Sequence, residues 1–221
     1  MYYETAANDH GLPHDPFLSC VVPRPIGWVT TCDREGRTNL APFSFFNGVG
    51  TCPPQVMFST VGTHADGGPK DSCANAETTG EFVINMATWA LREEMNLTSA
   101  YVAHGVDEAS LAGLDMAPSR LVAPPRVKRS PIHLVCRFSM SVRLPATDPE
   151  AVATVVFGTV VCVHIQDDVL TEGRVDVTKI RPIARLGYME YATIEQTFAM
   201  ERPTVGERPG HHLNRELMNR T

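Results

Sequence analysis

The sequence predicts a mostly β protein with inserted helices, of the α+β class. Short segments rich in β-branched and aromatic residues recur at 25–31, 55–61 and 81–86. Two longer apolar segments follow at 132–144 and 153–165. The chain has no GxGxxG after a first strand and no GxxxxGK[ST], so the sequence offers neither a Rossmann fold nor a Walker-type phosphate loop. An antiparallel β barrel is therefore favoured over a parallel α/β sheet.

Composition limits the classes of partner. The 221 residues are 43% hydrophobic, which is enough for a substantial core. Nineteen basic and 25 acidic residues give a net charge of −6, with no dense run of lysine and arginine. We therefore expect no nucleic-acid partner, and a small metabolite is the preferred ligand class.

The first residues lack a basic segment followed by an apolar run, and no stretch approaches the roughly 20 apolar residues of a membrane span. The six cysteines are scattered, without a CxxC pair or a Cys/His cluster at zinc-finger spacing. We expect a reduced, cytoplasmic protein with no membrane partner, no disulfide framework and no metal. The cysteines are expected to be small buried hydrophobic residues.

The first half of the chain begins with a predicted hairpin. Segments 25–31 and 37–46 flank turn residues at 33–36. Pro42 lacks an N–H, so we expect the chain to leave the strand ladder there and to free the N–H groups of Phe43 and Ser44 for a ligand. The alternative is a bulged strand whose aromatic residues all belong to the core.

A loop followed by a short helix is predicted between the strands at 55–61 and 81–86. Asp71 or Ser72 can cap its first turn, and Gly80 can end it. His64, in the polar loop, is expected to be exposed.

The second half adds helices and two long strands. Segment 88–105 is the best helical stretch, and 107–116 suggests a shorter helix. Segment 132–144 alternates in part, whereas 153–165 is nearly continuously apolar, as in a buried strand.

Several stretches carry a resemblance to a known family. They are residues 21–59, "KDSCANAETTGEFVIN", "SPIHLVC", "VVFGTVV" and "IRPIARLGYMEYA", in that order. The chain resembles the flavin reductase-like family of FMN-binding split-barrel flavoproteins, which includes flavoredoxin, over about residues 20–203. Val135 and Thr159 stand where family members frequently carry an acidic residue, so no carboxylate role is transferred to these positions.

The resemblance implies a Greek-key antiparallel split β-barrel, which we assign to residues 1–203. From about residue 205 the sequence loses its pattern, so 204–221 is expected to form a C-terminal tail. The resemblance also implies a homodimer with one FMN per subunit near the interface, and reduction of flavin by NADH or NADPH. A partner monooxygenase or an electron acceptor protein can then receive the electrons. The alternatives are an electron carrier with tightly bound FMN and a non-catalytic FMN-binding protein.

The demands of FMN match particular residues. The segment "NLAPFSFFN" suits the planar ring, with its hydrogen-bonding edge, and the ribityl chain. The segment "PKDS" at a helix start suits the phosphate, because Lys70 supplies a cation and Ser72 a hydrogen-bond donor. Asp71 would repel the phosphate, so it is expected to cap the helix or to pair with Lys70 or an arginine. The full set of expected cofactor-binding residues is Arg24, Asn39, Ala41, Pro42, Phe43, Ser44, Asn47, Ser59, Lys70, Asp71, Ser72 and Arg185.

Some of these assignments keep alternatives. Arg24 can reach the phosphate, a partner subunit or only a surface carboxylate, and Arg185 can contact flavin or the dimer mate. Hydride transfer from nicotinamide to flavin N5 needs no protein nucleophile, so no catalytic residue is expected.

Overall fold

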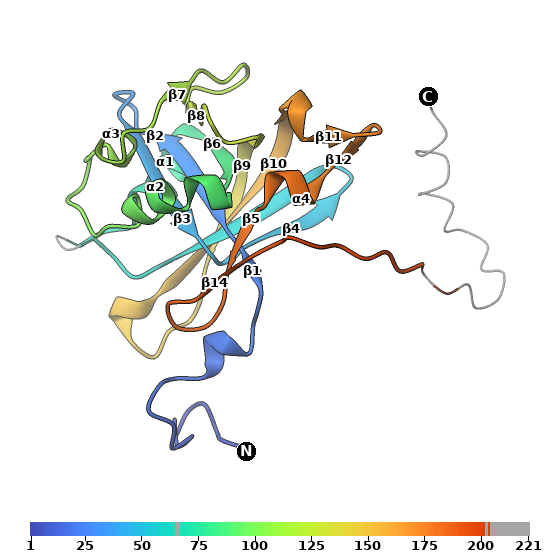
Figure 1. Cartoon of the computed structure of the whole chain (residues 1–221). Coiled ribbons are helices and arrows are strands. Elements are labelled where there is room, and N and C mark those ends of the chain that lie inside the picture. The colour runs from blue at the N-terminus through green and yellow to red at the C-terminus, as the bar shows by residue number, and fades with distance from the viewer. Residues whose placement is uncertain (65–66, 202, 204–221) are drawn as a thin grey trace.

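The chain is built around one seven-stranded sheet in the order β3-β2-β6-β9-β10-β5-β4 (Figure 1). The computed structural model describes residues 1–64, 67–201 and 203. Every neighbouring pair of strands in this sheet is antiparallel, which confirms the predicted fold class. The strands are β2 (Gly27–Cys32), β3 (Thr38–Phe43), β4 (Phe46–Thr51), β5 (Pro54–Val61), β6 (Glu81–Met86), β9 (Ile132–Arg143) and β10 (Ala153–Ile165).

The predicted hairpin is the β2–β3 pair. Its register runs from Gly27 opposite Phe43 to Cys32 opposite Thr38. The expectation that the chain leaves the ladder at Pro42 was wrong, because Pro42 lies within β3, opposite Trp28. β3 is an edge strand, where a proline is tolerated on the side that needs no ladder donor. The strand ends at Phe43, so Ser44 lies outside the sheet.

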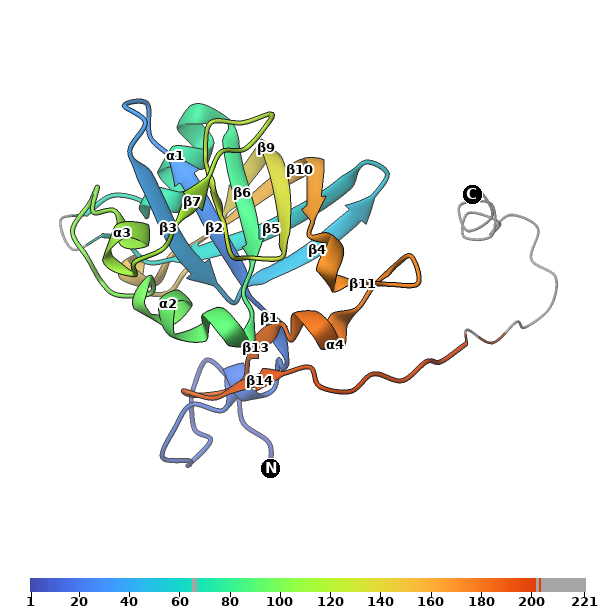
Figure 2. The same cartoon turned by 45° about the horizontal axis from the view of Figure 1, so that its top comes forward.

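The sheet curls so that its two ends approach each other (Figure 2). The Phe43 and Phe58 rings are 5.2 Å apart, and the Ser59 N–H donates to Phe45 O at 2.8 Å. Helix α1 (Asp71–Thr79) packs against β2 and covers one end of the interior. The buried cluster inside consists of Val29, Val56, Phe58, Cys73, Ala76, Phe82, Ile84, Cys136 and Val156.

The boundaries of α1 were predicted correctly only at the carboxyl end. Gly80 ends the helix with φ of 75°, a conformation that favours glycine. At the amino end Lys70 is the cap residue, and no side chain caps the first turn. The prediction that Asp71 or Ser72 caps the helix was therefore wrong, because both already lie inside it.

Segment 88–105 forms less helix than expected. It contains only a 3-10 turn, η2 (Trp89–Leu91), and the short helix α2 (Arg92–Leu97). The buried Thr98 hydroxyl donates to Met95 O and accepts from Trp28 Nε1, so the residue after the helix is held against the core. The predicted shorter helix is present as α3 (Glu108–Leu111).

Both long strands were predicted within a residue at each end, but the expected burial of β10 was wrong. Val161 and Val163 are 40% and 50% exposed, so the second half of β10 is only partly covered. The expected burial of the cysteines was only partly correct: Cys32, Cys73 and Cys136 are buried, whereas Cys20 and Cys52 are exposed. All six are free thiols, as expected.

A second, three-stranded sheet of β1 (Arg24–Pro25), β13 (Ile183–Arg185) and β14 (Tyr191–Thr193) joins the two ends of the described chain. It lies below the main sheet, beside the N-terminal segment (Figures 1 and 2). The remaining elements are η1 (Phe17–Ser19), β7 (Met116–Ala117), β8 (Arg126–Val127), η3 (Pro149–Ala151), η4 (Asp167–Val169), β11 (Leu170–Thr171), β12 (Arg174–Val175) and α4 (Val177–Ile180). The predicted tail, 204–221, lies outside the described residues. Within the described ranges, the helices are all too short or too polar to span a bilayer.

Gly158 is required where β10, in the wall of the barrel, packs against Phe82 of the interior cluster. A Cβ at this position would meet Phe82 Cζ at 2.3 Å and Arg137 O at 3.0 Å. We expect Gly158→Ala to lower the free energy of unfolding by about 1–3 kcal/mol, because the Phe82 ring has to shift within a packed core. Urea denaturation measures the change. Gly48→Ala, where the nearest atom is 4.0 Å away, is the matched control, and equal stability of the two variants would contradict the prediction.

The buried His133 gives the fold a pH dependence. Its Nε2–H donates to Val127 O at 2.9 Å, so Nδ1 accepts from His164 Nδ1 at 3.2 Å. Burial lowers the pKa of His133 to about 4 from 6.5, and Arg126 and His164 add to this effect. Between these values the unfolded chain binds the proton and the folded chain does not, so stability falls as the pH falls from 6.5 to 4.

The expected loss over that range is on the order of 3 kcal/mol. Urea denaturation at several pH values measures it. His133→Gln should give a flatter dependence across the same range, and an unchanged slope would show that this ring is not responsible.

Candidate functional site

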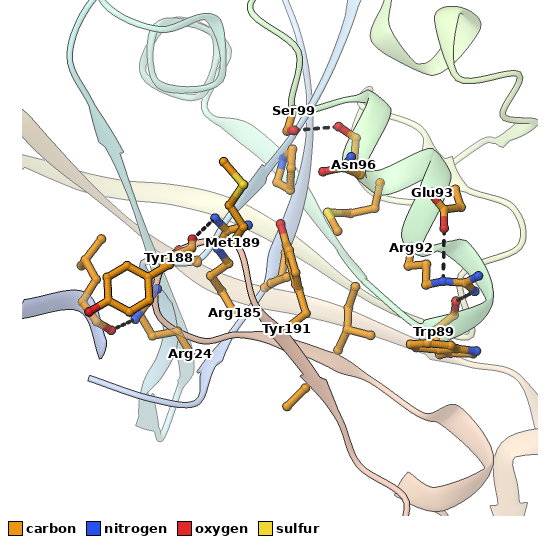
Figure 3. A pocket seen from close by; sticks show the side chains of 17 residues that line it. Arg24, Trp89, Arg92, Glu93, Asn96, Ser99, Arg185, Tyr188, Met189 and Tyr191 are labelled. Atoms are coloured by element: carbon orange, nitrogen blue, oxygen red, sulfur yellow. Dashed lines mark hydrogen bonds and ion pairs between the residues drawn. The ribbon is translucent and has the colours of Figure 1, made fainter. Parts of the chain in front are cut away.

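Two hollows lie side by side next to the edge strand β3. The small hollow has a volume of about 180 Å³ and lies between β3, the amino end of α1 and residues 98–102. The large hollow, of about 840 Å³, lies between α2 and the β13–β14 turn (Figure 3). Pro42 and Ser99 line both, so the two hollows meet there.

The small hollow gathers the predicted phosphate site and the predicted β3 wall in one place. Seven of the expected cofactor-binding residues line it: Asn39, Ala41, Pro42, Phe43, Lys70, Asp71 and Ser72. β3 supplies the first four and the start of α1 supplies the rest. The hairpin and the loop before α1, which are separate in sequence, therefore converge as expected.

The donors of the small hollow are held by buried polar contacts. Asn39 Nδ2 donates to Ser72 Oγ at 2.8 Å, so the Ser72 hydroxyl keeps its own proton for another acceptor. Asn75 Nδ2 donates to Thr31 Oγ1 at 3.2 Å and braces the same group of side chains. The Lys70 ammonium lies 4.6 Å from the centre of the Tyr101 ring. A cation, a hydroxyl donor and a helix amino end thus face one cavity, which suits an anion.

Two carboxyl groups also line this cavity. Glu108 Oε2 accepts from the Leu40 N–H at 3.0 Å, and burial raises the pKa of this side chain above its usual range. Asp71 was expected to cap the helix or to pair with Lys70 or an arginine, but it contacts two histidines instead. His64 Nε2 lies 3.2 Å from Asp71 Oδ1, and His104 Nδ1 is hydrogen-bonded to the same oxygen.

His64 was expected to be exposed, and this was wrong. Its side chain is only 12% exposed, because it lies against Asp71 at the start of α1. Nε2 accepts the backbone N–H of Asp71 at 3.0 Å.

The large hollow contains three further predicted residues, Arg24, Ser44 and Arg185. Arg24 is buried, and its guanidinium donates to Leu18 O, Val21 O and Leu186 O at 2.5–2.7 Å. These bonds tie the N-terminal segment to the β13–β14 turn, so they explain the burial of Arg24 without a ligand. Contact of Arg24 with a phosphate stays a prediction.

The other wall of the large hollow comes from η2 and α2. The Arg92 guanidinium stacks on the Trp89 ring at 4.2 Å, and Trp89 is 42% exposed. Across the hollow, the Arg185 guanidinium lies 4.6 Å from the centre of the Tyr191 ring (Figure 3). Both walls present aromatic faces with an arginine over each, and this combination suits a flat, polar-edged ring.

Two predicted residues line neither hollow. Asn47 lies on β4 with its Oδ1 accepting from the Gly48 N–H, and the buried Ser59 donates to Thr60 O at 3.4 Å. Sequence reasoning also missed several lining residues: Trp89, Arg92, Thr98, Ser99, Tyr101 and Glu108. These residues lie in the segment after β6, which was predicted to be helical. This segment folds back onto β3, and no short sequence motif indicates that contact.

Comparison with known proteins identifies the family. The model of the flavin reductase like domain matches residues 18–190. The chain belongs to the flavin reductase-like family. An uncharacterized protein, BH2278, of Halalkalibacterium halodurans is 35% identical over 190 residues, covering 86% of this chain and 90% of that protein.

Two solved structures resemble the flavin reductase-like chain over most of their length. One is nitrilotriacetate monooxygenase component B from Bacillus cereus, with a TM-score of 0.81, 28% identity and coverage of 90% of this chain and 98% of that one. The other is the 2-nitrobenzoate 2-nitroreductase NbaA from Pseudomonas fluorescens, with a TM-score of 0.78, 25% identity and coverage of 95% and 100%. The split-barrel fold predicted from the sequence is confirmed.

Proposed function

We propose that this chain is an FMN-binding oxidoreductase of the flavin reductase type, which takes hydride from NADH or NADPH. The observation that carries this proposal is the junction of the two hollows at Pro42 and Ser99. A small, donor-rich cavity suits a phosphate, and a wide cavity with aromatic walls suits a planar ring. Membership of the flavin reductase-like family supports a flavin as the molecule that carries both groups.

The residues present fit FMN in this arrangement. Lys70 and the Ser72 hydroxyl would hold the phosphate, and Asn39 would keep Ser72 in place. Ala41 and Pro42 would form the small-residue wall beside the ring, while Arg185 and Tyr191 would close its far side. The bound flavin would supply the hydride-accepting chemistry, and the protein would position the ring and limit access of water.

A homodimer is part of this proposal. Strands β9 and β10 carry exposed apolar residues, among them Met140, Val142 and Val161. A second copy of the chain would cover such a surface. A monooxygenase or another electron acceptor protein is the proposed recipient of electrons, and one structural relative carries the name of a monooxygenase component.

Anaerobic stopped-flow mixing of the FMN-loaded protein with NADH and with NADPH tests the proposed activity. Rapid bleaching of the flavin absorbance by either nicotinamide is the expected result. If photoreduction bleaches the flavin and neither nicotinamide does, the proposed reductase activity is wrong, and the chain is an electron carrier that holds FMN tightly. Failure to bind FMN would overturn the cofactor assignment itself.

A further inference from the structure

Three side chains with metal-binding atoms converge at the edge of the small hollow. His64, Asp71 and His104 each offer one such atom, and these atoms all lie within 4.8 Å of one another. The three residues come from different segments: the loop after β5, the first turn of α1 and the loop between α2 and α3. Their spacing resembles no short metal motif, which explains why the sequence predicted no metal.

We propose that His64, Asp71 and His104 form a binding site for one divalent transition-metal ion of the zinc type. Two imidazoles and one carboxylate are a donor set that such ions prefer over magnesium or calcium, which favour oxygen ligands. Three protein ligands leave a fourth coordination position for water or another ligand.

The fold prepares Asp71 to act as a ligand. Its side chain is 7% exposed, and its Oδ2 accepts the Gly105 N–H at 3.3 Å. The other oxygen, Oδ1, therefore faces both histidines. A hydrogen bond to the second carboxylate oxygen is the kind of contact that orients a metal ligand.

Hydrogen bonding with neutral rings leaves one contact unexplained. His64 Nε2 accepts the Asp71 N–H, so this nitrogen has no proton for Oδ1, which lies 3.2 Å away. Two electron-rich atoms at this distance repel each other. A cation bound to both atoms would turn the repulsion into attraction. It would take the Nε2 lone pair from the Asp71 N–H, and His104 would bind through a deprotonated Nδ1, so metal binding replaces both of these hydrogen bonds.

The site is reachable from solvent and borders the proposed phosphate position. The His104 side chain is 54% exposed, so an ion can enter from that side. Asp71 and His64 also line the small hollow with Lys70. A divalent ion would offset the negative charge of Asp71 there, and this consequence alone rests on the proposed function.

Titration of the full-length, chelator-treated protein with Zn²⁺ and with Co²⁺, without added flavin, tests the site. We expect one equivalent to bind in calorimetry, and Co²⁺ to give d–d absorption bands in the visible range. His64→Gln and His104→Gln should each weaken binding by at least about tenfold, because each removes a ligand. His164→Gln is the matched control, since it removes a member of the other histidine pair, His133 and His164.

Thermal melts of each variant check that the fold is retained. The exposed His104 ring makes His104→Gln the safer of the two ligand variants. The proposal is overturned if the wild-type protein binds no stoichiometric metal, or if His64→Gln and His104→Gln bind it as tightly as His164→Gln does. The assay contains no flavin, so its failure leaves the proposed function untouched.

Discussion

Replacing Lys70 by alanine is expected to weaken FMN binding by about 10- to 100-fold, because a charge-assisted contact to phosphate contributes roughly 1.5–3 kcal/mol. Riboflavin has the same ring and ribityl chain but no phosphate, so its affinity should change by less than about twofold. Fluorescence titration with both flavins measures the difference. The Lys70 ammonium rests near the Tyr101 ring and lines the small hollow, so it can turn toward an anion there.

Lys179→Ala is the control for the loss of one positive charge. Lys179 lies on α4, where its ammonium donates to Leu170 O, and it lines neither hollow. Its replacement should leave both flavins unaffected. If Lys70→Ala weakens FMN and riboflavin equally, the phosphate does not lie beside Lys70, and the small hollow holds some other part of the ligand.

The sequence predicted the sheet well because its signals are local. The β2–β3 hairpin follows from turn residues between two β-branched segments, and the ends of β9 and β10 follow from the length of their apolar runs. Pro42 shows the limit of this reasoning. A proline disfavours a position in a central strand, but the sequence does not reveal which strand lies at the edge of the sheet. In the structure that strand is β3, so Pro42 is tolerated.

The candidate site was predicted where one element supplies several residues and missed where distant segments meet. β3 and the start of α1 supply consecutive lining residues, so a short motif reveals them. Tyr101 and Glu108 reach the same hollow only because the chain after α2 folds back over β3. The predicted partners of Asp71 were wrong for the same reason, because one of its actual partners, His104, lies 33 residues away in sequence.

Ser99→Trp is expected to reduce binding of both FMN and riboflavin by about 100-fold or more. Ser99 is exposed and lines both hollows, so a tryptophan there would fill their junction and leave no path for a ligand that spans them. Excluding on the order of 100 Å² of apolar ring surface would account for a loss of this size. The fold should be unaffected, because the Ser99 side chain is exposed and, among the described residues, its hydroxyl bonds to Asn96 O alone, at the end of α2.

The pattern across variants distinguishes the two halves of the proposed ligand site. Lys70→Ala should discriminate between the two flavins, whereas Ser99→Trp should not, because the ribityl chain that both flavins share would lie in the junction. Thr147→Trp adds the same side chain at an exposed position that lines neither hollow, and it should bind both flavins normally. If Ser99→Trp binds flavin as tightly as Thr147→Trp does, the ligand does not span the junction, and the two hollows serve different molecules.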